Sequence, residues 1–165
     1  MPPLRFRHGV RAIVLDQDDR MLLCRFVIPQ PSGSVVVWAA PGGGVEEGET
    51  PPAALRRELD EEVGLTLEGE PPHVWRQQVV DPGHAAGYDG VVNDYYLVRS
   101  RRFEPRGALS DEELAAENIR GFRWWRLAQI AGYAGPDLFS PRDLATPLRA
   151  LLADGPPAEV VRLGR

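Results

Sequence analysis

Apolar residues fall along the chain in short runs that are separated by polar or glycine-rich turns. Runs rich in β-branched and aromatic residues occupy 10–15, 21–26, 35–38, 74–80, 91–98 and 122–126. Runs of this length and composition favour strands. The polar segment 16–20 between the first two runs predicts a hairpin, whereas 29–34 and 81–90 are predicted loops and 41–44 is a predicted glycine turn.

Residues 51–63 have the apolar spacing of a helix, with an apolar residue at every third or fourth position. Thr50 offers an N-cap hydroxyl, Pro51 suits the first helical position, and Gly64 stands where a glycine ends a helix. The sequence therefore predicts a capped helix with one apolar face.

A last helix is predicted near the end of the sequence, because Leu144, Leu148 and Leu151 repeat at helical spacing before Gly155. Ser140–Pro141 is expected to cap it. Strands and helices together predict an α/β (α+β) layered fold.

The length of 165 residues is that of a single domain, 1–165, and the structure of its tail, 156–165, stays open. No apolar run approaches the ~20 residues of a membrane span. The N-terminal residues lack the apolar core of a signal peptide, so a cytoplasmic location is expected. The single cysteine, Cys24, lies in an apolar run and is interpreted as a packed thiol rather than a nucleophile.

Negative charge is concentrated in one segment. Residues 43–65 contain seven acidic and two basic side chains, so the net charge of this segment is −5. The net charge of the whole chain is also −5. The 19 basic residues are all arginine, and they form no basic stripe. Binding to duplex nucleic acid is therefore not expected.

Three carboxylates, Glu58, Glu61 and Glu62, share one edge of the predicted helix beside its apolar face. Like charges so placed repel each other, and the single guanidinium of Arg57 cannot neutralise all three. A hard divalent cation, Mg²⁺ or Mn²⁺, bound together with substrate phosphates would do so. From these residues alone, a merely solvated acidic face remains the alternative.

A longer pattern decides between these interpretations. Gly43, five residues, Glu49, seven residues, and then Arg57 to Leu65 match the box G-x5-E-x7-R-E-U-x-E-E-x-G-U, where U is apolar. The sequence thus resembles the Nudix hydrolases over about 8–153. The resemblance implies an α/β/α sandwich with a mixed β-sheet, and hydrolysis of a nucleoside diphosphate linked to another group X.

The resemblance also implies roles for the matching residues. Glu58, Glu61 and Glu62, with the carbonyl of Gly42, correspond to ligands of Mg²⁺ (or Mn²⁺). Glu49 and Arg57 correspond to a pair that holds the box loop on its helix. Gly43 and Gly64 are the fixed glycines of the box.

The general base varies in this family, so several candidates stay open. Within the box we favour Glu61 as the catalytic residue, because it is central in the acidic cluster, followed by Glu58. Outside it, Glu112, Glu113 and Glu117 precede the strand predicted at 122–126.

Substrate contacts are weakly indicated. Arg11, Arg25 and Arg76 are candidates for phosphate binding, and His73 and His84 are expected at the surface. Candidates to stack on a small-molecule nucleotide are Trp75, Tyr88, Tyr95, Tyr96, Trp124 and Trp125. A non-catalytic nucleotide sensor and a structural metal-binding helix are the alternative functions, and a homodimer stays open.

Overall fold

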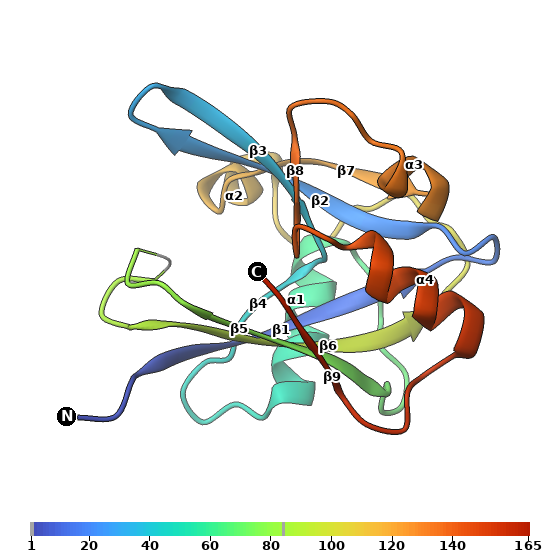
Figure 1. Ribbon diagram of the computed structural model, residues 1–165, viewed down its shortest axis with the longest axis horizontal. Coiled ribbons are helices and arrows are strands. Elements are labelled where there is room, and N and C mark those ends of the chain that lie inside the picture. The colour runs from blue at the N-terminus through green and yellow to red at the C-terminus, as the bar shows by residue number, and fades with distance from the viewer. Residues whose placement is uncertain (1, 84) are drawn as a thin grey trace.

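A mixed β-sheet organises the computed structural model, which describes residues 2–83 and 85–165 (Figure 1). Its main path runs β8-β3-β2-β1-β6-β5-β9, with β4 paired to β1 and β7 to β2. Three pairs are parallel, β1 with β6, β3 with β8 and β5 with β9. The strands are β1 (Phe6–Leu15), β2 (Met21–Gln30), β3 (Gly33–Ala39), β4 (Gly42–Gly44), β5 (His73–Val80), β6 (Gly90–Arg99), β7 (Ile119–Trp125), β8 (Leu138–Ser140) and β9 (Val161–Leu163).

Helices cover both faces of this sheet. They are α1 (Pro51–Glu62), α2 (Asp111–Ala116), α3 (Leu127–Ala131) and α4 (Ala145–Asp154). Side chains of β1 alternate between the faces: Ala12 and Val14 pack in one core with Leu59 of α1, whereas the intervening Ile13 packs in a second core with Leu148 of α4. The predicted α/β/α sandwich with a mixed sheet is therefore confirmed.

The predicted hairpin forms, but its two strands separate early. β1 and β2 are antiparallel and share the register pair Leu15↔Met21. Beyond it β1 pairs with β6 and β4, while β2 pairs with β3 and β7. Because β1 and β2 take different partners, a space opens between them toward the N-terminal half of β1.

The last helix begins later than predicted. Ser140 is the final residue of β8, which pairs with β3, and the Ser140–Pro141 peptide bond is cis. Helix α4 starts at Ala145 after Leu144, which makes no side-chain cap hydrogen bond. The predicted cap was wrong because pairing with a strand distant in sequence takes up residues 138–140.

Two loops and the tail also differ from the prediction. β2 continues to Gln30 and β3 begins at Gly33, so a turn of two residues replaces the predicted loop 29–34. The tail, for which no structure was predicted, forms β9 along β5. In the described part of the chain, the helices are all too short or too polar to cross a membrane.

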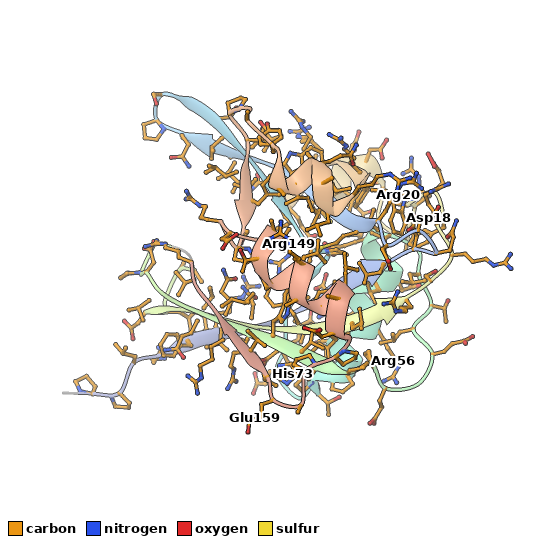
Figure 2. All side chains as sticks on the ribbon, turned by 45° about the vertical axis from the view of Figure 1, so that its right-hand side comes forward. Asp18, Arg20, Arg56, His73, Arg149 and Glu159 are labelled. Carbon is orange, nitrogen blue, oxygen red and sulfur yellow. The ribbon has the colours of Figure 1, made fainter. Side chains whose placement is uncertain are left out.

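A polar turn, residues 16–20, connects β1 to β2. Asp16 accepts hydrogen bonds from the backbone amides of Asp18 and Arg20 through Oδ1. The side chains of Asp18 and Arg20 lie next to each other at the edge of the molecule, 3.3 Å apart (Figure 2). Arg102 also reaches Asp16 at 3.3 Å, which joins this turn to the segment after β6.

Candidate active site

A cavity of about 560 Å³ lies where β1 and β2 separate. Strands β1 to β6, helix α1 and three later segments contribute to its walls. Its charged lining consists of the acids Glu58, Glu62 and Glu117 and the arginines Arg7, Arg11, Arg142 and Arg165. Its apolar lining includes Phe26, Ile28, Val37, Val79, Val91 and Phe139.

Local sequence positions helix α1 beside this cavity. The Thr50 hydroxyl accepts a hydrogen bond from the Ala53 amide at 3.3 Å, and Pro51 occupies the first turn. At the other end Gly64 has φ 76°, and its amide donates to the Leu59 carbonyl at 2.9 Å. A side chain at Gly64 would collide with the Arg106 carbonyl oxygen. These caps are those the sequence predicted, within one residue of the predicted end.

The glycines of β4 lie directly against the carboxylates of α1. The Gly42 amide donates to Glu62 Oε1 at 2.8 Å. At Gly43 a Cβ atom would come within 2.5 Å of Glu58 Oε1. Any residue larger than glycine at this position would therefore displace the Glu58 carboxylate.

Arg57 ties the loop before α1 to the carboxylates on it. Its guanidinium donates to both oxygens of Glu49, at 2.7 and 2.9 Å, and to the Gly44 carbonyl at 3.1 Å. Its Nη1 donates to Glu58 Oε1 at 2.9 Å and lies 3.5 Å from Glu61 Oε2. The pair that the sequence analysis expected between Glu49 and Arg57 is thus a bidentate ion pair.

The three carboxylates of α1 differ in environment. Glu62 and Glu58 are buried at 1% and 7% relative exposure, whereas the Glu61 side chain is 32% exposed. Among residues 2–83 and 85–165, no three His, Cys, Asp or Glu side chains converge closely enough to hold a metal ion. Helical spacing alone predicted a tighter cluster, but Arg57 binds Glu58 and Glu61, and the Gly42 amide binds Glu62.

The charge of the buried pair is incompletely compensated. Burial, followed by the nearby Glu58, raises the pKa of Glu62 to about 8. Burial likewise raises the pKa of Glu58, against the opposing effect of Arg57. A divalent cation is the kind of counter-charge that would remove this penalty, so the donor set suits a hard cation.

The structure places the three candidate general bases outside the box, Glu112, Glu113 and Glu117, in different environments. Glu117 lines the cavity, and its charge contributes to the raised pKa of both Glu58 and Glu62. Glu113 instead forms a capping box with Ser110 at the start of α2. Glu112 is exposed on the same helix. Asn118, with φ 66°, turns the chain after Glu117 into β7.

Of the three arginines that the sequence singled out, Arg11 lines the cavity within the described structure. It donates to the Ala40 carbonyl at 2.9 Å and lies over the Phe26 ring. Arg76 instead pairs with Asp94 at 3.2 Å, and Arg25 lies on β2 outside the lining.

Three lining arginines were missed by the sequence analysis. Arg7 lies four residues before Arg11 on β1. Because side chains of a strand alternate between its faces every two residues, both lie on the same face, and this alternation could have revealed Arg7. Arg142 and Arg165 come from segments whose position depends on pairing with β3 and β5, for which the local sequence carries no signal.

The aromatic candidates belong mainly to the core. Trp75, Tyr95 and Trp125 are about 1% exposed. Among residues 2–83 and 85–165, the phenyl rings that line the cavity are those of Phe26 and Phe139. The indole of Trp124 donates a hydrogen bond to the Phe103 carbonyl, and Tyr96 stacks on His73. The ring of Tyr88 lies under the Arg5 guanidinium. His84 falls outside the described residues.

Two further residues that the sequence analysis singled out have buried or paired environments. Cys24 is buried, and burial raises the pKa of its thiol well above the ordinary value. His73 lies at the start of β5, where its Nε2 is 2.8 Å from Asp94. Neither residue lines the cavity that the described chain forms.

The fold belongs to a known class of structures. The MutT protein from Methanosarcina mazei superposes with a TM-score of 0.64 over 93% of this chain and 98% of that one, at 15% identity. This likeness shows the fold alone. The family model of the NUDIX domain matches residues 5–145. The chain therefore belongs to the Nudix domain family.

Curated relatives share part or most of the sequence. An RNA pyrophosphohydrolase of Acidiphilium cryptum is 30% identical over 141 residues, which cover 81% of this chain and 83% of the relative. An RNA pyrophosphohydrolase of a Sulfurovum species is 33% identical over 99 residues. That match spans 57% of this chain and 62% of the relative, about three fifths of its length.

Proposed function

We propose that this chain hydrolyses the pyrophosphate linkage of a nucleoside diphosphate joined to another group X, with Mg²⁺ or Mn²⁺ as cofactor. The single observation that carries the proposal is the division of one cavity. Buried carboxylates line it on α1, and arginines line it on β1 and later segments. A cation and a phosphate chain would each meet the opposite charge there.

The carboxylates Glu58, Glu61 and Glu62, together with the Gly42 carbonyl, would hold the cation. A bound divalent cation neutralises phosphate charge and makes a bound water more acidic. Arg57 holds two of the three carboxylates in place, since its Nη1 lies within 3.5 Å of Glu58 and Glu61. Glu49 in turn holds Arg57 through two hydrogen bonds.

The reaction requires a water oxygen to attack one phosphorus while the bond from that phosphorus to the bridging oxygen breaks. Glu61 accepts the proton of the attacking water, because it is the least buried of the three carboxylates and its contact with Arg57 is the longest that this guanidinium makes with α1, at 3.5 Å. Arg11 binds a phosphate oxygen from the β1 side. Glu117 is the competing proton acceptor.

The apolar part of the cavity supports a nucleotide as the substrate. Phe26 and Phe139 provide aromatic surface, and Ile28 and Val37 lie on neighbouring strands. Such surface stacks on or packs against a base. The relatives named RNA pyrophosphohydrolase make the 5′ end of an RNA one form of X to test.

The deciding experiment incubates the purified chain with nucleoside diphosphate derivatives, nucleoside triphosphates and a 5′-triphosphorylated RNA oligonucleotide. Each is measured with Mg²⁺, with Mn²⁺ and with excess chelator. Metal-dependent release of phosphate or pyrophosphate from one class supports the proposal. The Glu61→Gln variant should lose this turnover. Glu47→Gln is its matched control, because Glu47 is an exposed acid of the same box.

A different result would favour the alternative function. If no compound is cleaved while a nucleotide raises the melting temperature, the chain is a nucleotide sensor. If neither turnover nor a nucleotide-dependent shift is seen, the structural metal-binding helix remains, provided that Mg²⁺ or Mn²⁺ alone raises the melting temperature.

A further inference from the structure

The C-terminal segment contributes to the cavity although it lies beyond the matched family region, which ends at residue 145. Strand β9 adds to the sheet edge by parallel pairing with β5, with Trp75 opposite Val161 and Gln77 opposite Leu163. In Figure 1 the chain then runs from β9 back toward the middle of the view, where the C-terminal end is marked. This path brings Arg165 to the cavity wall.

Specific contacts hold the segment in this position. The buried Gln77 side chain donates to the Gly164 carbonyl at 3.2 Å, and its Oε1 accepts from the Tyr95 hydroxyl at 3.2 Å. The Arg142 amide donates to the Arg165 carbonyl at 3.0 Å. Arg165 also pairs with Asp81 at 2.7 Å. Two arginines 23 positions apart in sequence are thus joined by their backbones at one wall.

The two side chains are suited to bind an anion. Arg142 is exposed and forms no ion pair with any carboxylate among residues 2–83 and 85–165. Arg165 is 64% exposed despite its pair with Asp81. Guanidinium groups bind phosphate through two parallel hydrogen bonds each, so two neighbouring arginines match the oxygens of a terminal phosphate.

We propose that Arg142 and Arg165 bind the terminal phosphate of the substrate, and that the C-terminal segment thereby selects nucleotides with three or more phosphates over those with two. This inference rests on the proposed function. Arg11 and Glu58 serve the linkage that is cleaved, whereas Arg142 and Arg165 serve the next phosphate along the chain. A substrate that lacks this phosphate leaves both arginines without a ligand.

Steady-state kinetics with the triphosphate and diphosphate of one nucleoside test the proposal. The double variant Arg142→Gln/Arg165→Gln is expected to raise KM for the triphosphate about tenfold with kcat little changed, as expected for lost charge-assisted hydrogen bonds. KM for the diphosphate should change less than twofold. Arg165→Lys should recover part of the loss, because it keeps the charge without the planar fork.

Arg162→Gln is the matched control, because Arg162 lies on β9 itself, is exposed and is not part of the lining. It should leave both KM values unchanged, and the melting temperatures of all variants should agree with that of the unmodified chain. Equal changes in KM for the triphosphate and the diphosphate, or no change for either, would overturn the proposal.

A binding measurement separates this inference from the proposed function. Calorimetry with inorganic tripolyphosphate and pyrophosphate requires no turnover. Tighter binding of tripolyphosphate that the double variant loses would support the inference even if no nucleotide is hydrolysed. Conversely, hydrolysis of nucleotides with tripolyphosphate binding that is unaltered in the double variant would refute the inference and leave the proposed function in place.

Discussion

Glu49 holds the guanidinium of Arg57 with both carboxylate oxygens, at 2.7 and 2.9 Å, across the turn that leads into α1. The same guanidinium reaches Gly44, Glu58 and Glu61. One ion pair therefore connects the loop, the glycine strand and the carboxylates of the helix. Its effect on the site is indirect, through the orientation of the groups that Arg57 binds.

Glu49→Gln should lower both activity and stability. The amide keeps one acceptor but loses the charge and the bidentate geometry, so Arg57 no longer fixes Glu58. We expect kcat to fall about 10- to 100-fold, as is typical when a group that orients a ligand is removed. Thermal melting and turnover of the two proteins provide the comparison. An unchanged melting temperature would contradict the structural role of Glu49.

The same ion pair predicts how stability depends on acid. Hydrogen bonds from Arg57 lower the pKa of Glu49 from 4.5 to about 2 in the folded chain. Because the folded pKa is depressed, this contribution is complete above pH 4.5 and is lost as pH falls toward 2. Urea unfolding should therefore separate Glu49→Gln from the unmodified chain at pH 7 more than at pH 3. A constant difference between the two would count against the pair.

Glu62 predicts a dependence of the opposite sign. Burial and Glu58 raise its pKa to about 8, so its contribution is complete below pH 4.5 and is lost as pH rises through 8. In chelator, the unmodified chain should lose on the order of a few kcal/mol between pH 5 and 9 from this group. Glu62→Gln keeps the acceptor for the Gly42 amide and should remove that loss. Denaturant midpoints across this pH range measure the difference.

Glu61→Gln should abolish metal-dependent turnover with little loss of folding. The residue is partly exposed and its ion pair with Arg57 is long, at 3.5 Å, so removal of its charge costs the fold little. A loss of about 100-fold or more in kcat is expected for a general base. Glu117→Gln should lower kcat less, because Glu117 is the competing proton acceptor and Glu61 the proposed one. The reverse order of the two effects would transfer the role of base to Glu117.

Much of the site could be predicted because its signals are local. Thr50 and Gly64 cap α1 through contacts within a few residues, and helical spacing places Glu58 and Glu62 on one side beside Leu59. Alternation along β1 likewise follows from the period of a strand. Such features depend on neighbours in the chain, so the sequence by itself determined the helix, the central strands and the residues of the box.

The tertiary structure decided the rest, because pairing between distant segments leaves no local pattern. The parting of β1 from β2 after Leu15 creates the cavity, and pairing with β3 and β5 carries Arg142 and Arg165 to it. Arg57 divides carboxylates that helical spacing alone would cluster. Sequence therefore determined which groups the site contains, and long-range strand pairing determined which of them face one another.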